Sequence, residues 1–172
     1  MKSAAALLLS ACLGLGCLGV GGAAWADGID GTPGADHLTG TDGPDTITAL
    51  AGDDVVHAGR GADIVLGGLG DDRVDGQRGP DELRGGPGDD VLNAGRDPKK
   101  DIVFGDRGAD RIFVFGIDNG YGGPGGDRIW GTYAAAGMQV DCGPGHDVLI
   151  FNQPSPKVVR VGCEVVKVRS AG

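Results

Sequence analysis

Hydrophobic residues in the middle of this chain recur every nine positions, which is neither the helical nor the strand period. From residue 31 to residue 93 the chain divides without a gap into seven nine-residue blocks, from GTPGADHLT to GGPGDDVLN. The fourth position of every block is Gly, the sixth is Asp and the eighth is aliphatic. The aliphatic residues are Leu38, Ile47, Val56, Val65, Val74, Leu83 and Leu92. Seven consecutive blocks of one pattern indicate a repeat protein.

Each block predicts a turn followed by a very short strand. Its first six residues are rich in Gly, Pro and Asp, and Gly supplies the positive φ angles that a tight turn needs. The last three residues form a strand whose middle, aliphatic side chain points inward. Because that side chain needs a partner across a thin core, two blocks close one coil of eighteen residues. The predicted fold is all-β, a parallel β-solenoid with two blocks per coil.

The sixth-position aspartates of alternate blocks would then line the two edges of the solenoid, about one strand spacing (~4.8 Å) apart. Carboxylates at such a short distance repel each other when water is partly excluded. Ca²⁺ relieves the repulsion, because it takes about 6–8 oxygen ligands and Gly-rich turns can supply backbone carbonyls. Mg²⁺ is less suitable, since it demands tighter octahedral geometry. We therefore expect calcium at the edges, while turn-forming aspartates without metal stay open as the alternative.

Composition agrees with a turn-rich protein that binds cations. The 172 residues include 36 Gly, and the 22 aspartates far outnumber two glutamates, Glu82 and Glu164. So much Gly argues against long helices, since Gly costs about 1 kcal/mol per helical position relative to Ala. Asp is preferred over Glu where a short carboxylate folds back onto a turn or a metal. The net charge of −9 makes nucleic acid a poor partner and cations a good one.

The repeat becomes irregular after residue 93. An eleven-residue block carries Asp101, the next block returns to the pattern with Asp110, and residues 114–121 are degenerate. We expect the solenoid to continue through this part of the chain.

Two later blocks, 122–130 and 142–150, match again through Asp127 and Asp147. Because the spacing around them is irregular, we expect these two aspartates to lack a neighbour in register on the same edge. Their role therefore stays open between metal ligand and turn residue.

The first 26 residues have the features of a secretory signal. Lys2 precedes an apolar run over 4–20, and Ala24-Trp25-Ala26 fits the pattern before a cleavage site. We expect cleavage after Ala26 and secretion, with a membrane anchor or a lipoprotein lipidated at Cys12 as alternatives. Losing Lys2 takes the net charge from −9 to −10. The two remaining cysteines, Cys142 and Cys163, would lie outside the cell, where disulfides persist, so we expect one bridge.

Two blocks, GGLGDDRVD (67–75) and GGPGDDVLN (85–93), match every specified position of the pattern G-G-x-G-x-D-x-U-x. The sequence thus resembles the RTX, or haemolysin-type, calcium-binding proteins. The resemblance implies a right-handed parallel β-roll that holds Ca²⁺ between successive turns, with sixth-position aspartates and turn carbonyls as ligands. The implied metal ligands are Asp36, Asp45, Asp54, Asp63, Asp72, Asp81, Asp90, Asp101, Asp110, Asp127 and Asp147.

Counting neighbouring aspartates on each edge over the seven regular blocks predicts about five Ca²⁺ ions or more. Some blocks depart from the family pattern, because their second position is Thr32, Thr41, Leu50 or Gln77 instead of Gly. We expect weaker binding at those turns. Asp53, Asp71 and Asp89, each just before a ligand aspartate, are expected to be solvated neighbours.

The tail, VDCGPGHDVL followed by VVRVGCEVV, resembles a closing module of secreted actinobacterial members of this family. By that resemblance the bridge from Cys142 to Cys163 clips a final strand over the end of the solenoid, which would otherwise be an open sheet edge. The expected organisation is a calcium-binding roll over 27–113, followed by degenerate repeats and a disulfide-bonded cap over 114–172.

Catalytic patterns are absent from the sequence. After residue 26 its only serines are Ser155 and Ser170, its histidines all lie in repeat blocks, and no zinc-ligand spacing occurs. We predict no enzymatic activity, no membrane span and a monomer that folds when it binds extracellular Ca²⁺. Two alternatives remain: a module that binds carbohydrate or a cell surface, and a polysaccharide lyase. A lyase would need a basic stripe, for which the candidates are Arg60, Arg73, Arg78 and Arg84.

Overall fold

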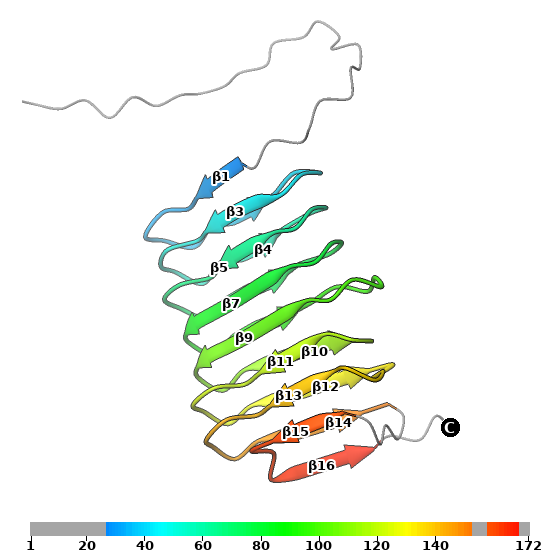
Figure 1. Ribbon diagram of the computed structural model, residues 1–172. Coiled ribbons are helices and arrows are strands. Elements are labelled where there is room, and N and C mark those ends of the chain that lie inside the picture. The colour runs from blue at the N-terminus through cyan, green and yellow to red at the C-terminus, as the bar shows by residue number, and fades with distance from the viewer. Residues whose placement is uncertain (1–26, 153–157, 169–172) are drawn as a thin grey trace, which may run out of the picture.

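The computed structural model describes residues 27–152 and 158–168, which form sixteen short strands and no helix. The chain winds as a flattened solenoid of about eight turns, and its two eight-stranded parallel sheets lie opposite each other (Figure 1). The odd sheet contains β1 (Asp27–Asp30), β3 (Asp45–Thr48), β5 (Ile64–Leu66), β7 (Glu82–Pro87), β9 (Ile102–Arg107), β11 (Asn119–Tyr121), β13 (Gln139–Asp141) and β15 (Val159–Val161). The even sheet contains β2 (His37–Thr39), β4 (Val55–His57), β6 (Arg73–Asp75), β8 (Val91–Asn93), β10 (Arg111–Phe115), β12 (Arg128–Thr132), β14 (Val148–Phe151) and β16 (Val165–Val168).

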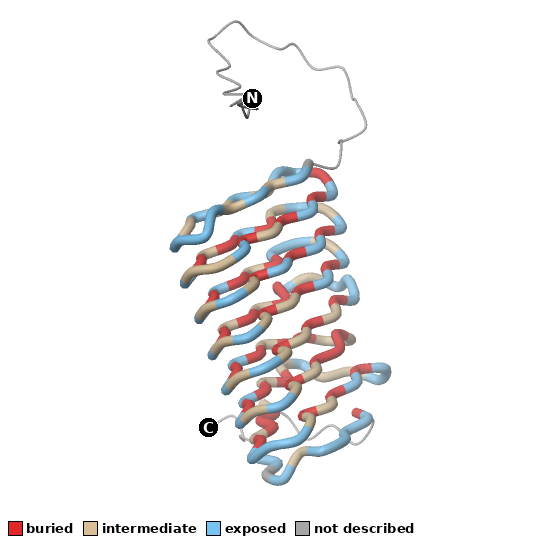
Figure 2. Tube along the Cα trace, turned by 90° about the vertical axis from the view of Figure 1, so that its left-hand side faces the viewer, coloured by how far each residue is buried: buried red, intermediate tan, exposed pale blue. Residues whose placement is uncertain are grey.

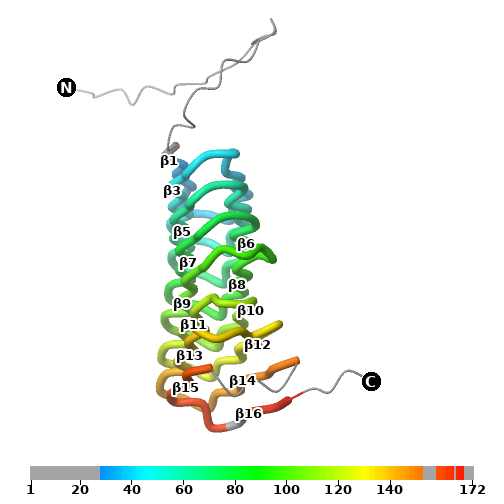
Figure 3. Tube along the Cα trace, turned by 45° about the vertical axis from the view of Figure 1, so that its right-hand side comes forward, coloured from blue at the N-terminus to red at the C-terminus, as the bar shows by residue number. Residues whose placement is uncertain are grey.

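Equivalent positions of alternate blocks stack directly on one another. In the even sheet Val56 pairs with Val74, and in the odd sheet Ile47 pairs with Val65, in each case eighteen residues further along the chain. The predicted coil of two blocks is therefore confirmed. Figure 3 shows the strands of the two sheets as separate columns along the length of the molecule.

The core is the thin space between the two sheets. The eighth-position side chains from Ile47 to Leu92 are almost completely buried, whereas Leu38 in the first coil is partly buried. Ala49, Ala58 and Ala94 fill the same layer next to them. Figure 2 shows the buried residues recurring at the same places in each coil. A core built from single aliphatic side chains of three-residue strands explains why so few aromatic residues suffice.

The solenoid continues in register through the irregular blocks. Leu92 pairs with Ile112, which pairs with Ile129, and Ile129 with Leu149, so turns of different length absorb the changes of spacing. The degenerate block supplies β11, where Gly120 occupies the aliphatic position opposite Val103. Strand β10 runs across the boundary expected at residue 113, and the coils stack on both sides of it.

The last coil ends in β15 and β16, next to a disulfide between Cys142 and Cys163 with a Cα–Cα distance of 5.1 Å. The predicted bridge is thus confirmed. The expected signal segment and its cleavage site lie outside the described residues. Among those that are described, no helix is long and apolar enough to cross a membrane.

Aromatic side chains stack on the outer faces of both sheets. The ring centres of Phe104 and Tyr121 lie 4.9 Å apart on the odd sheet, and the Arg84 guanidinium lies 4.5 Å from the Phe104 ring centre. Phe113 and Trp130 lie 4.7 Å apart on the even sheet. Both pairs follow directly from the parallel register, which places the ninth positions of adjacent coils side by side.

Candidate metal sites

The sixth-position aspartates lie where each turn enters its strand, and their side chains point into the structure. All of them from Asp45 to Asp147 are at most 3% exposed, and Asp36 in the first coil is half-buried. Carboxylates are almost never buried to this extent unless they are paired. Their partners therefore decide what the two edges can do.

From Asp54 onward, one oxygen of each of these carboxylates accepts a backbone amide of the preceding coil. The Oδ1 atom of Asp72 accepts the Asp54 amide at 2.9 Å, and the same bond repeats from coil to coil. We call the row before the even strands the even ladder; its hydrogen bonds measure 2.7–2.9 Å. It consists of Asp36, Asp54, Asp72, Asp90, Asp110, Asp127 and Asp147.

The odd ladder precedes the odd strands in the same manner. Its members are Asp45, Asp63, Asp81, Asp101 and Asp118, linked by amide-to-Oδ1 bonds of 2.8–3.1 Å. Asp127 and Asp147 were expected to lack in-register neighbours, and that expectation is wrong: both continue the even ladder beyond Asp110. The turns change length, but the strands they enter stay in register.

The second oxygen of most ladder carboxylates is buried without a hydrogen-bond partner. These unpartnered Oδ2 atoms belong to Asp54, Asp63, Asp72, Asp81, Asp90, Asp110, Asp127 and Asp147. A buried charged oxygen without a partner is strongly unfavourable, and native structures normally satisfy it with a donor or a cation. The row of such atoms therefore indicates a cation on each edge.

A backbone carbonyl shares the space beside several of these oxygens. A Cβ atom on Gly67 would lie 2.5 Å from Asp72 Oδ2 and 2.6 Å from the carbonyl oxygen of Gly85 in the next coil. The Gly85 carbonyl already accepts the Gly68 amide but keeps a second lone pair. Gly105 is placed in the same way, next to Asp110 Oδ2 and the next coil. Glycine at the first position thus leaves room where two kinds of hard oxygen donor converge.

These residues fit Ca²⁺ by the chemistry of their donors, which are all oxygen. Among the described residues no three acidic, histidine or cysteine side chains gather at one point. This follows from the architecture, since each edge receives one ladder carboxylate per coil. A cation there must draw further ligands from turn carbonyls or water.

The first carboxylate of each ladder already has a partner for its second oxygen. Asp36 Oδ2 accepts the Thr32 amide and hydroxyl, and Asp45 Oδ2 accepts the same groups of Thr41. The threonines that depart from the glycine pattern thus occupy the oxygens that a metal would use. Asp36 and Asp45, both predicted ligands, lie on the ladders, but the threonine of the same turn already donates hydrogen bonds to each carboxylate.

Asp118 is the ladder member that sequence reasoning missed. Its Oδ1 accepts the Asp101 amide at 3.1 Å, and its Oδ2 accepts the Phe115 amide at 2.7 Å. The signal was present, because Gly116 and Asp118 keep the Gly-x-Asp spacing. It was hidden because Gly120 replaces the aliphatic residue two positions later.

Beyond Asp118 the two edges differ. The register of β11 and β13 places Met138, which is fully buried, at the next aspartate position. The odd ladder therefore ends at Asp118, whereas the even ladder continues to Asp147.

Burial raises the pKa of several ladder carboxyls above the ordinary value of 3.8. The pKa is raised to about 8 for Asp101 and to about 7 for Asp81, Asp90 and Asp110. Desolvation is the largest cause, the backbone hydrogen bond opposes it, and neighbouring carboxylates add to it. Near neutral pH the edges therefore carry charges that the fold disfavours until a cation balances them.

A second, outer row of aspartates runs beside the even ladder. Asp53 Oδ1 accepts the Asp71 amide at 3.0 Å, and Asp71 Oδ1 accepts the Asp89 amide at 2.8 Å. These residues are exposed, in contrast to the ladder. With Arg73 and Arg111 they line a groove of about 450 Å³.

The four arginines named as a basic stripe for a lyase do not lie together, although Arg60 and Arg78 are paired in adjacent coils. Arg73 lies on β6 of the even sheet, whereas Arg84 lies on β7 of the odd sheet. Arg60 lies 3.6 Å from Asp42, and Arg84 lies 3.7 Å from Glu82, which matches simple pairing with acidic neighbours.

Stacked parallel coils with buried carboxylate ladders on both edges define a metal-binding β-roll. The comparison with protein families gives the same answer in more detail. Residues 30–65, 66–97 and 100–113 match the family model of the RTX calcium-binding nonapeptide repeat, in four copies. No curated protein and no solved structure matches the chain. The molecule therefore contains a calcium-binding β-roll whose coils extend beyond the matched residues.

Proposed function

We propose that this protein is a secreted β-roll that folds when Ca²⁺ binds between its coils. The observation that carries the proposal is the set of eight buried Oδ2 atoms without a partner. Each lies at one edge in a position that repeats along the chain, so a row of ions would satisfy them all.

The proposed ligands are the ladder aspartates together with turn carbonyls. Asp54, Asp72, Asp90, Asp110, Asp127 and Asp147 would serve the even edge, and Asp63, Asp81 and Asp101 the odd edge. Asp36 and Asp45 remain predicted ligands, but their threonine partners would have to yield. When bound, the ions supply positive charge between carboxylates that otherwise repel across one strand spacing.

Coupling of folding to calcium rests on the balance between a thin core and many charges. Each coil buries few apolar side chains, and the sequence has a net charge of −9. Chains of low hydrophobicity and high charge do not fold unaided, and metal-binding free energy then becomes folding free energy. Proteins with these repeats are typically extracellular, and the Cys142–Cys163 disulfide suits that compartment.

The deciding experiment is far-UV circular dichroism of residues 27–172 during a Ca²⁺ titration, with Mg²⁺ as the control cation. We expect a cooperative coil-to-β transition at about 0.1–1 mM Ca²⁺, the range of extracellular calcium modules. A chain that is fully folded in chelator and indifferent to Ca²⁺ would overturn the proposal.

Carbohydrate binding on the same scaffold is a second candidate, favoured by one hollow on the odd sheet. Phe104, Tyr121, Pro87 and Pro124 line this space of about 400 Å³, and Arg107 lies beside them. Mostly apolar hollows with a few polar groups are typical ligand sites. Retention on polysaccharide resins in Ca²⁺, compared with Tyr121→Ala, tests it; equal retention of both proteins would count against the hollow.

A further inference from the structure

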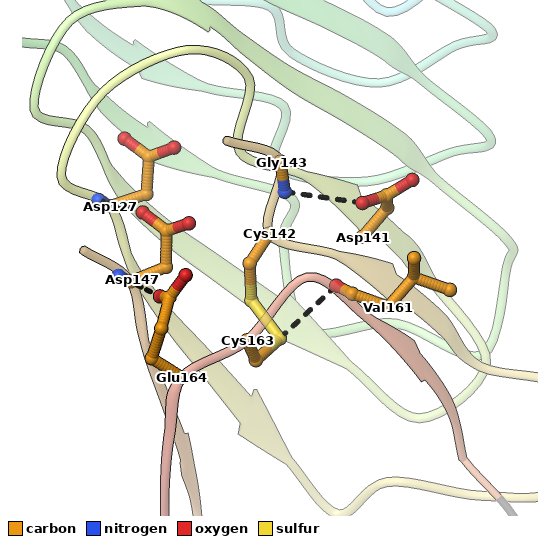
Figure 4. The surroundings of a disulfide bond; sticks show 8 residues. All are labelled: Asp127, Asp141, Cys142, Gly143, Asp147, Val161, Cys163 and Glu164. Atoms are coloured by element: carbon orange, nitrogen blue, oxygen red, sulfur yellow. Dashed lines mark hydrogen bonds between the residues drawn. A yellow bond between two sulfur atoms is a disulfide. The ribbon is translucent and has the colours of Figure 1, made fainter. Parts of the chain in front are cut away.

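The even ladder does not end at its last aspartate. The Asp147 amide donates a hydrogen bond to Oε2 of Glu164, as each ladder amide does to the next aspartate (Figure 4). Strand β16 pairs with β14 so that Val165 lies opposite Val148, which places Glu164 at the position of a ladder aspartate. A glutamate thus forms the final carboxylate of the row.

A shorter turn explains why a glutamate, with its longer side chain, stands here in place of an aspartate. Only residues 162–164 connect β15 to β16, whereas residues 142–147 connect β13 to β14 in the preceding coil. The shorter connection lacks the Gly-rich turn that presents an aspartate. Glutamate has one more methylene group, so its carboxylate still reaches the Asp147 amide.

The disulfide fixes this turn to the coil before it. Cys163 is the residue before Glu164, and its partner Cys142 stands at the first position of the preceding block. The carbonyl oxygen of Cys142 also belongs to the repeated cradle. A Cβ atom on Gly122 would lie 2.3 Å from that oxygen and 2.4 Å from Asp127 Oδ2. The Cys142 carbonyl therefore lies at the candidate site of Asp127, and its disulfide bond holds the turn that carries Glu164.

A second observation points to a cation at the final step. Asp147 is completely buried, and its Oδ2 atom has no hydrogen-bond partner although Oδ1 accepts the Asp127 amide. Figure 4 shows the Asp127, Asp147 and Glu164 carboxylates in one column beside the disulfide. Glu164 itself is exposed, so this end of the column is open to solvent.

We propose that Glu164 and Asp147 form a terminal Ca²⁺ site, which the Cys142–Cys163 disulfide holds in place. The inference rests on the proposed calcium-dependent function and adds a ligand outside the nine-residue repeat. Because Glu164 is exposed, this site is the weakest of the even edge and the first to empty when calcium falls.

The test is the Ca²⁺ stoichiometry of the oxidised chain over residues 27–172, measured by isothermal titration calorimetry. Glu164→Gln keeps an oxygen that can accept the Asp147 amide but removes the charge. Glu82→Gln is the matched control, because the Glu82 side chain is exposed on the outer face of β7 and lies 3.7 Å from Arg84, and it is not a member of either ladder. We expect Glu164→Gln to bind one ion fewer than the native chain and Glu82→Gln to bind the native number.

A double variant, Cys142→Ser with Cys163→Ser, tests the role of the disulfide. It should lose the same ion, and adding Glu164→Gln to it should cause no further loss. If Glu164→Gln binds the native number of ions at native affinity, Glu164 only caps the Asp147 amide and the inference is wrong. A native chain that binds no Ca²⁺ at all would instead overturn the proposed function itself.

Discussion

A carboxylate on either ladder serves two neighbouring coils at once. Oδ1 of Asp90 holds the Asp72 amide of the preceding coil at 2.8 Å, while Oδ2 faces the Gly105 carbonyl of the following one beside Gly85. The first contact needs only an acceptor, whereas the second needs a cation. The two oxygens can therefore be separated by substitution.

Asp90→Asn keeps an acceptor for the Asp72 amide and removes the charge. We expect it to weaken Ca²⁺ binding at its edge by roughly tenfold or more, about 1.4 kcal/mol. Asp89→Asn is the control, since Asp89 is adjacent in sequence, exposed and bonded to the backbone of Ala109. Calorimetric titration of both variants with Ca²⁺ measures the two affinities. Equal losses would mean that general negative charge, not the ladder, attracts calcium.

Glycine at the fourth position is fixed by the contact between coils. Gly79 has a φ of +130°, and a Cβ atom there would lie 1.5 Å from the Gly61 carbonyl oxygen. We expect Gly79→Ala to destabilise the calcium-loaded roll by about 2 kcal/mol or more. Gly126→Ala should be close to neutral, because its Cβ would meet nothing nearer than 3.8 Å. Urea denaturation in saturating Ca²⁺ measures both, and similar midpoints would contradict the close packing of the turns.

At the scale of the element, a three-residue strand of the regular blocks contributes one inward side chain to the core, such as Val56 of β4 or Val74 of β6. The nine-residue period predicted these strands correctly because turn and strand alternate within each block. It could not predict that β7 and β9 extend to six residues, since that extension comes from pairing of Gly86 with Asp106 and of Pro87 with Arg107. Pairing between coils is a tertiary effect that no single block contains.

Leu92 tests how much one strand contributes. It is completely buried in the centre of β8, so Leu92→Ala should cost about 2–5 kcal/mol of unfolding free energy. Val91, its neighbour on the outer face, is half-buried, and Val91→Ala should cost less than about 1 kcal/mol. Thermal denaturation in saturating Ca²⁺ compares the two. A small loss for Leu92→Ala would show that metal binding, and not the aliphatic core, dominates the stability of the coil.

For the whole molecule, the sequence predicted the solenoid and most of the ladders but not where the ladders end. Asp118 was obscured by Gly120, and Glu164 was obscured by a turn half the usual length. The partners of Asp36 and Asp45 depend on the rotamers of Thr32 and Thr41, which a repeat pattern does not specify. Composition and period set the architecture, whereas the use of each carboxylate depends on individual contacts.

The stability of the metal-free roll should fall as pH rises. Burial raises the pKa of several ladder carboxyls above the ordinary 3.8, to about 7 for Asp90 and to about 8 for Asp101, so the folded state binds more protons than the unfolded chain. The stabilisation is therefore complete near pH 4 and is lost up to about pH 8. With Ca²⁺ the trend reverses, because the metal needs deprotonated ligands.

Circular dichroism between pH 5 and pH 8, in a chelator and in excess Ca²⁺, measures both trends. More β structure at pH 5 than at pH 8 in the chelator is the expected result. A metal-free chain with the same content of β structure at both values would show that the buried carboxylates do not control its folding.

The ladder hydrogen bonds also bear on the order in which the coils can form. Each aspartate amide donates to a carboxylate about eighteen residues later, so a coil that leaves a ribosome or a membrane pore first must wait for a partner that has not yet emerged. Glu164, behind its disulfide, is the last described carboxylate of the even row. In a chain delivered N-terminus first, each of these amides would thus be satisfied only after the next coil has emerged.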